Sequence, residues 1–249
     1  MVTIKKNIIF LVSFFIFISF NSIHVSALYT TATKKTVYLT FDDGPSVKVT
    51  KEIINILNAN NIKGTFFVVG DYVSIYPYIL KDLDDNNMAI MPHCNYHDYS
   101  SLYKSEDSYF NDLENCTRSI QKVIGNKKMN FVRLPGGADN TYCEIDTLEK
   151  IKTNLLNKEI NYLDWTIDSG DSESYDISKD YLVSRIRDEG CLYDVEVVLM
   201  HDLGGKSTTY EALQEIIDIY KDRGYEFKSL NEIQDYEIDY LKSINVLNK

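Results

Sequence analysis

The segment Val37-Tyr38-Leu39-Thr40-Phe41-Asp42-Asp43-Gly44-Pro45 decides the fold class of this chain of 249 residues. Its first five residues are β-branched, aromatic or aliphatic, which is typical of a buried strand. The four residues that follow are strong turn formers and end the strand. Apolar residues at helical spacing over 49–57 then predict a helix that ends near Asn60. A strand, a turn and a helix in this order form the repeating unit of α/β proteins.

The same alternation continues along the chain to residue 234, without a repeat, a linker or a charge block. Further strands are predicted at 65–69, 90–91, 131–132, 162–165 and 195–200. Helical periodicity predicts one helix over 110–124 and a later one that starts with a capping box of Thr208 and Glu211 and ends at Gly224. These elements favour a single α/β domain, built as a parallel barrel or a wound sheet.

The first 27 residues have the pattern of a signal peptide. Lys5 and Lys6 precede an apolar run over 8–20, and the small residues Val25 and Ala27 suit cleavage before Leu28. The apolar run is too short to span a bilayer, since a membrane helix needs about 20 residues. We therefore expect a protein that is secreted or associated with the cell surface. An uncleaved N-terminal membrane anchor is the alternative.

The charge balance excludes some partners. The chain has 26 basic and 37 acidic residues, a formal net charge of −11. Such a surface repels nucleic acid and anionic lipid, so neither is an expected partner. The four cysteines are too few for a disulfide-built miniprotein, and the sequence does not determine whether any of them pair.

Five polar residues follow predicted strands: Asp42, His93, Arg133, Asp168 and His201. Because the carboxyl ends of parallel strands meet at one edge of the sheet, these side chains are expected to form a shared site.

A metal site is predicted within this group. His93 and His97 are four residues apart, which would place both imidazoles on one face of a helical turn. Asp42-Asp43 offers a third ligand, because adjacent carboxylates after a strand point in different directions. One carboxylate can then bind the metal while its neighbour handles a proton.

Five ordered motifs resemble those of the polysaccharide deacetylases, carbohydrate esterase family 4. They are Thr40–Pro45, His93–His97, Arg133–Gly137, Asp168–Asp171 and Leu199–Asp202. The resemblance covers roughly residues 36 to 230 of this sequence. It implies a single-domain distorted (β/α) barrel of the polysaccharide deacetylase (NodB homology) type. The implied division is a signal peptide at 1–27, a lead-in at 28–35, the catalytic domain at 36–235 and a C-terminal extension at 236–249.

The resemblance also implies the roles of individual residues. Asp43, His93 and His97 would hold a divalent metal, in the first place Zn²⁺, with Co²⁺ or another divalent ion as alternatives. Asp42 would be the general base, and His201 would protonate the departing amine.

Supporting roles follow from the same resemblance. Arg133 would pair with Asp42 and orient it, while Asp171 would pair with His201 and raise its pKa. Asp168 is a second candidate for the partner of His201.

Three residues are expected on the substrate side: Leu199, which resembles the leucine of the acetyl pocket, and Pro135 and Gly136. Besides the stretch from Met88 to Pro92, which replaces a Gly-rich approach to the histidines, two single residues depart from the family pattern. Cys94 stands where Ser or Thr is usual, and its thiol can fill space, join a disulfide or approach the metal. Ser172 stands where many members have a tryptophan.

The implied function is a secreted, monomeric, metal-dependent deacetylase that acts on N-acetyl groups of a polysaccharide, with peptidoglycan N-acetylglucosamine as the first candidate. Chitin oligomers and acetylated xylan are alternatives within the family. The rivals are a catalytically silent cell-wall-binding protein of the same fold and a hydrolase that uses the metal on small cyclic amides or imides, as some relatives of this fold do.

Overall fold

A computed structural model describes residues 34–174 and 176–249. The signal peptide expected at 1–27 and most of the lead-in expected at 28–35 lie outside these residues. Within the described part of the chain, no helix combines the length and the apolar character needed to cross a membrane.

Every ladder between the named strands is parallel. The main sheet has the order β3-β2-β1-β7-β6, and β8 pairs with the first half of β1, while β4 and β5 form a second ladder. The strands are β1 (Thr36–Asp42), β2 (Thr65–Val69), β3 (Ala89–Cys94), β4 (Phe131–Val132), β5 (Asn161–Tyr162), β6 (Ile167–Asp168), β7 (Val195–His201) and β8 (Glu226–Lys228).

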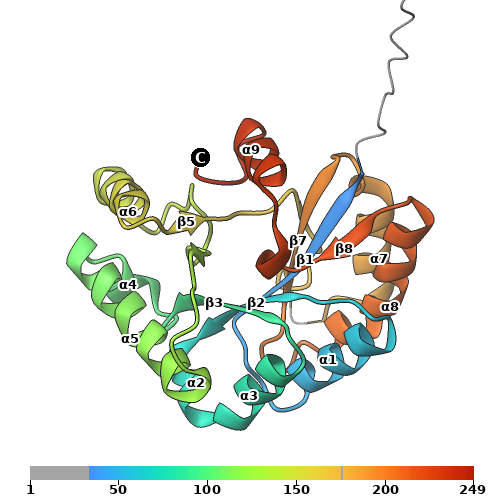
Figure 1. Cartoon of the computed structure of the whole chain (residues 1–249), viewed down its shortest axis with the longest axis horizontal. Helices are drawn as coiled ribbons and strands as arrows, with labels where there is room; N and C mark the ends of the chain where they lie inside the picture. Colours follow the sequence, from blue (N-terminus) through green and yellow to red (C-terminus); the bar gives the residue numbers. More distant parts are fainter. Residues whose placement is uncertain (1–33, 175) are drawn as a thin grey trace, which may run out of the picture. The chain divides into compact units, whose positions relative to one another are not determined.

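Figure 1 shows the helices arranged around these strands. The helices are α1 (Val49–Ala59), α2 (Gly70–Ile75), α3 (Pro77–Asp85), α4 (Tyr99–Leu102), α5 (Glu106–Ile124), α6 (Ile145–Asn157), α7 (Lys179–Glu189), α8 (Ser207–Asp222) and α9 (Asp235–Ser243), with a 3-10 turn, η1, at Leu230–Glu232. Inner strands covered by outer helices, in two separate ladders, make a distorted (β/α) barrel. The predicted α/β class and single-domain barrel are confirmed.

The central strand β1 is buried along its whole length. Its odd-numbered residues, Val37 to Phe41, pack against apolar side chains of the surrounding helices, including those of α1 and α8. Tyr38 points the other way and joins an inner cluster with Phe67 and Val197. Because side chains alternate along a strand, Thr40 and Asp42 continue that inner face. The middle of the barrel interior is therefore apolar, and its carboxyl end is polar.

Local sequence signals placed most elements correctly. The predicted strands at 65–69 and 131–132 coincide with β2 and β4, and α5 ends at Gly125, which has a left-handed φ of 77°. The predicted capping box at the start of α8 was wrong. Lys206 is the N-cap residue, no side chain caps this end, and Thr208 lies inside the helix.

The predicted strand at 162–165 was also too long. Only Asn161 and Tyr162 form β5, and Leu163 makes an isolated bridge with Leu247. The segment 236–249, expected as an extension, thus packs on the barrel, with the hydroxyl of Tyr162 donating to the carbonyl of Lys249 at 2.6 Å. Helix α9 spans the expected boundary at 235, so this boundary divides no structural unit.

Candidate active site

The site begins where β1 and β7 end side by side. Asp42 and His201 are register partners in the parallel ladder, and Thr40 pairs with Leu199 one alternation earlier. All four therefore belong to the inner face of the barrel. Asp42 is 3% exposed, and Leu199 is 4% exposed.

Arg133, the residue directly after β4, holds Asp42 in place. Its fully buried guanidinium donates to Asp42 Oδ1 at 2.9 Å and to Thr40 Oγ1 at 2.7 Å. It also donates to the carbonyls of Leu163 and Asp164, each at 3.0 Å. These two carbonyls follow β5 directly and point at the arginine. An ion pair this well hydrogen-bonded fixes one oxygen of Asp42 and leaves the other available.

Aromatic rings complete the surroundings of Arg133. Its guanidinium lies 4.4 Å from the ring centroid of Phe67 and 5.8 Å from that of Trp165. Its carbonyl is 2.8 Å from His93 Nδ1. The arginine therefore links the Asp42 side of the site to the histidines.

Asp43, His93 and His97 converge as predicted from the sequence. Asp43 turns out of β1 with a left-handed φ of 74°, and its Oδ1 lies 3.4 Å from His93 Nε2 and 3.5 Å from His97 Nε2. The three potential ligand atoms lie within 4.8 Å of one another.

The donor set fits a divalent cation. One carboxylate and two imidazoles are typical ligands of such an ion. Asp43 Oδ1 is buried and has no hydrogen-bond partner among the described residues. Burial raises the pKa of Asp43, but the close contact with His93 and the charges of His93, His201 and His97 more than reverse this effect and hold that pKa below its usual range.

The prediction that His93 and His97 share one face of a helical turn was wrong, although the two side chains do converge. His93 belongs to β3 and His97 follows a bend, so no helical turn joins them. The β2–β3 ladder skips His93, which leaves it as the extra residue of a bulge. The carboxylate of Asp112 on α5 then accepts hydrogen bonds from the backbone N–H groups of Asn95 and Tyr96, at 2.6 and 3.1 Å. The loop therefore turns back and brings His97 to Asp43.

The partner of His201 is Asp171. Its Oδ1 lies 2.7 Å from His201 Nδ1, and its Oδ2 accepts the backbone N–H of His201 and the hydroxyl of Thr209, each at 2.7 Å. Burial lowers the pKa of His201, but the hydrogen bond and charge of Asp171, helped by Asp42 and Asp43, raise it to about 9. Asp168 instead accepts the N–H of Gly170 at 2.8 Å. The structure thus places Asp171, and not Asp168, in the position that supports His201.

The expected substrate residues lie around this centre. The Pro135 carbonyl accepts the Tyr103 hydroxyl at 2.8 Å, which fixes the loop after β4. Gly136 has a φ of 79°, and a Cβ there would lie only 3.2 Å from the ring of Tyr142. That ring stacks on Tyr99 at 3.9 Å, beside His97.

Asp202 is a site residue for which the sequence predicted no role, although it is the last residue of the motif Leu199–Asp202. Its buried carboxylate accepts the Thr50 hydroxyl at 2.6 Å and lies directly under Gly44, where a Cβ would come within 2.0 Å of Oδ2. Burial raises its pKa to about 7. Asp202 therefore supports the turn that carries Asp43, and glycine is required above it.

The two departures from the family pattern have different surroundings. Cys94 is 1% exposed and a free thiol, and it is not a member of the cluster of potential metal ligands. Of the three alternatives for this thiol, the one in which it fills space fits the structure. Ser172 is exposed, so no aromatic wall stands at this position.

Comparison with known proteins agrees with this geometry. The family profile described as polysaccharide deacetylase matches residues 29–153. The chain is 29% identical to a peptidoglycan-N-acetylglucosamine deacetylase of Bacillus cereus over 214 residues, 83% of this chain and 73% of the relative. It matches the crystal structure of the catalytic domain of a peptidoglycan N-acetylglucosamine deacetylase from Eubacterium rectale with a TM-score of 0.73 and 30% identity, over 79% of this chain and 88% of that one.

A third similar structure is of a different kind. It is a carbohydrate esterase family 4 pseudoenzyme from Bacillus anthracis, with a TM-score of 0.67 and 26% identity, over 80% of this chain and 65% of that one. Membership alone thus does not establish activity, and the arrangement of the site residues becomes the deciding evidence. From its fold, its ordered motifs and these matches, the chain belongs to the polysaccharide deacetylase family.

Proposed function

We propose that the protein is a secreted, metal-dependent deacetylase that hydrolyses N-acetyl groups of peptidoglycan N-acetylglucosamine. Its family membership supports polysaccharide deacetylation in general. The named peptidoglycan deacetylases among its relatives support the choice of polymer. The N-terminal sequence pattern supports secretion.

One observation carries the metal dependence. The buried Asp43 Oδ1 has no hydrogen-bond partner among the described residues and faces the Nε2 atoms of His93 and His97. A buried carboxylate oxygen without a hydrogen bond is costly, and a cation bound there removes the cost. When bound, Zn²⁺ or a similar ion supplies Lewis acidity, which lowers the pKa of water and polarises the acetyl carbonyl.

The protein's own residues then move the protons. Asp42 Oδ1 is occupied by Arg133, so Oδ2 is free to accept a proton from the attacking water. His201 Nδ1 is occupied by Asp171, so Nε2 is free to donate a proton to the departing amine. Because the pKa of His201 is about 9, the imidazole is charged near neutral pH, as a general acid must be.

The remaining site residues position the substrate in this proposal. Leu199 lies on the same inner face as Asp42 and His201 and can contact the acetyl methyl group. The loop at Pro135 and Gly136 is held by Tyr103 on the opposite side. We expect a monomer.

A silent wall-binding protein is the second candidate, favoured by the pseudoenzyme among the structural neighbours. The complete acid, base and ligand set argues against it, because none of the proposed roles lacks a residue. Hydrolysis of small cyclic amides is disfavoured by the N-terminal signal pattern.

The test is acetate release by the purified protein from peptidoglycan, chitin oligomers and acetylated xylan, after chelation and with zinc added back. We expect zinc-restored release, highest on peptidoglycan. Higher release from chitin oligomers or xylan would make that polymer the proposed substrate in place of peptidoglycan. Metal-loaded protein that releases no acetate from any of the three polymers would favour the silent wall-binding protein.

A further inference from the structure

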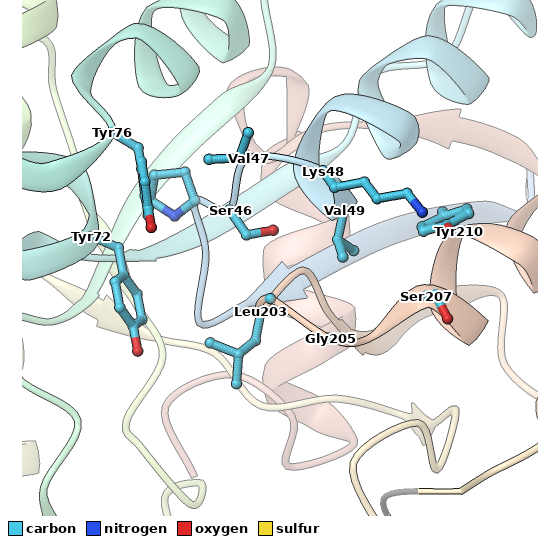
Figure 2. Close-up of a pocket in the computed structure, with 12 residues that line it drawn as sticks. Ser46, Val47, Lys48, Val49, Tyr72, Tyr76, Leu203, Gly205, Ser207 and Tyr210 are labelled. Atoms are coloured by element: carbon cyan, nitrogen blue, oxygen red, sulfur yellow. The ribbon is translucent and has the colours of Figure 1, made fainter.

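A hollow of about 530 Å³ lies beside the candidate active site, between the turn after β1, helix α2 and the loop before α8. Figure 2 shows its side chains: Tyr72 and Tyr76 stand on one side, and Lys48 extends toward the ring of Tyr210 on the other. We call this hollow the Lys48 pocket. Its volume lies in the range of pockets that bind small molecules.

The Lys48 pocket adjoins the site through three of its lining residues. Pro45 is the second residue after Asp43, and Leu203 is the second residue after His201. Tyr72 lines both this pocket and a separate hollow that contains His97. A polymer whose acetamido group lies at the metal ligands would therefore place a neighbouring unit here.

The charge of the lining is opposite to that of the whole protein. The chain carries 37 acidic residues, yet none of the described residues that line the pocket is acidic, and Lys48 is their one basic member. Glu52 and Glu211 act on Lys48 electrostatically, but they are not part of the lining. The Lys48 ammonium lies 5.6 Å from the ring centroid of Tyr210, so its charge is held at the pocket wall.

The N-terminal end of α8 adds to the positive character of the pocket lining. Ser207 starts this 16-residue helix within the lining, no side chain caps that end, and its first turn has no acidic residue. The positive end of a helix dipole favours a negative group nearby. The tyrosine rings offer apolar faces of the kind on which sugar rings can stack.

We propose that the Lys48 pocket binds a carboxylate-bearing sugar next to the acetamido sugar that reacts. This inference rests on the proposed function and narrows its substrate class. In peptidoglycan every second sugar carries a lactyl ether whose carboxyl group is free once the stem peptide has been removed, whereas the chitin and xylan backbones are neutral. Aromatic walls would hold the ring, and Lys48 would meet the carboxylate.

The test compares two glycans that differ only in this charge. Peptidoglycan strands freed of their peptides are used either with the lactyl carboxylates intact or with the carboxylates converted to methyl amides. The ratio of kcat/KM for acetate release from the two strands is measured for the wild type, Lys48→Ala, Lys48→Glu and Lys51→Ala. Lys51 is a matched control, because it lies in the first turn of α1, three residues after Lys48, outside the pocket and near Asp82.

We expect the wild type to prefer the acidic strand by about three- to fivefold, the size of an exposed charge pair, and the preference to shrink as salt is added. Lys48→Ala should bring the ratio close to one, Lys48→Glu should invert it, and Lys51→Ala should keep the wild-type ratio. An unchanged ratio in Lys48→Ala, or no preference in the wild type, would overturn the inference.

A second measurement separates this inference from the proposed function. If the wild type releases no acetate from either strand, the proposed function fails. The dissociation constants of the two strands, measured by calorimetry on the metal-loaded protein, then decide about the pocket. Tighter binding of the acidic strand that depends on Lys48 supports the pocket, and equal constants contradict it.

Discussion

The two halves of the candidate site differ in how fully their residues satisfy one another. In the acid–base half, Arg133 hydrogen-bonds Asp42, and Asp171 hydrogen-bonds His201 through both the ring and the backbone. In the other half, Asp43 Oδ1 is buried beside two imidazoles without a hydrogen bond in the described chain. The fold alone completes the first half, and in our proposal a cation completes the second.

The largest expected effect comes from the half that we assign to the metal. Asp43→Ala removes one of the three ligands and the only carboxylate among them. Bound zinc, measured by elemental analysis, and acetate release should both fall to background. Full activity or a full zinc complement in this variant would contradict the ligand assignment.

Asp42→Asn should separate the two halves. The amide keeps the shape of the side chain but cannot accept the proton, so the rate should fall by about a hundred- to ten-thousandfold. Zinc content should stay at the wild-type level, because the three ligands are untouched. Loss of zinc together with activity would show that the two halves are not independent.

Asp171→Asn should change the pH profile. His201 acts in its charged form, so kcat/KM should fall as the pH rises through its pKa of about 9. Removal of the Asp171 charge lowers that pKa, and the alkaline limb should move to lower pH. Asp168→Asn is the control, since Asp168 bonds the N–H of Gly170 and should move the limb less. A larger shift in Asp168→Asn would reverse the two roles.

The smallest effect is expected at Cys94. Its thiol is buried and outside the ligand cluster, so Cys94→Ala should keep the wild-type zinc content and activity within about twofold, at a cost of about 1 kcal/mol in the free energy of unfolding. Zinc titration and denaturant unfolding would check this. A weakened zinc affinity would mean that the thiol acts on the metal.

Much of the acid–base half could be predicted from the sequence, because its residues follow strands whose positions have a clear local signal. Phe131-Val132 is a short strand in both the sequence pattern and the structure, and Arg133 follows it directly. Parallel strands bring such ends together whatever the details of the loops are.

The shape of the histidine loop could not be predicted in this way. The convergence of His93 and His97 depends on a bulge in β3 and on Asp112, a residue of a different helix. Neither has a local signature in the sequence. The packing of Leu247 against Leu163 is equally long-range, which is why the C-terminal segment was expected outside the catalytic domain.

The most direct test of the difference between the two halves is a zinc titration of the chelator-treated protein, with acetate release from peptidoglycan measured at each point. On our proposal, activity disappears on chelation, returns in proportion to bound zinc and reaches its maximum at one equivalent per chain. Full activity in the metal-free protein would contradict it.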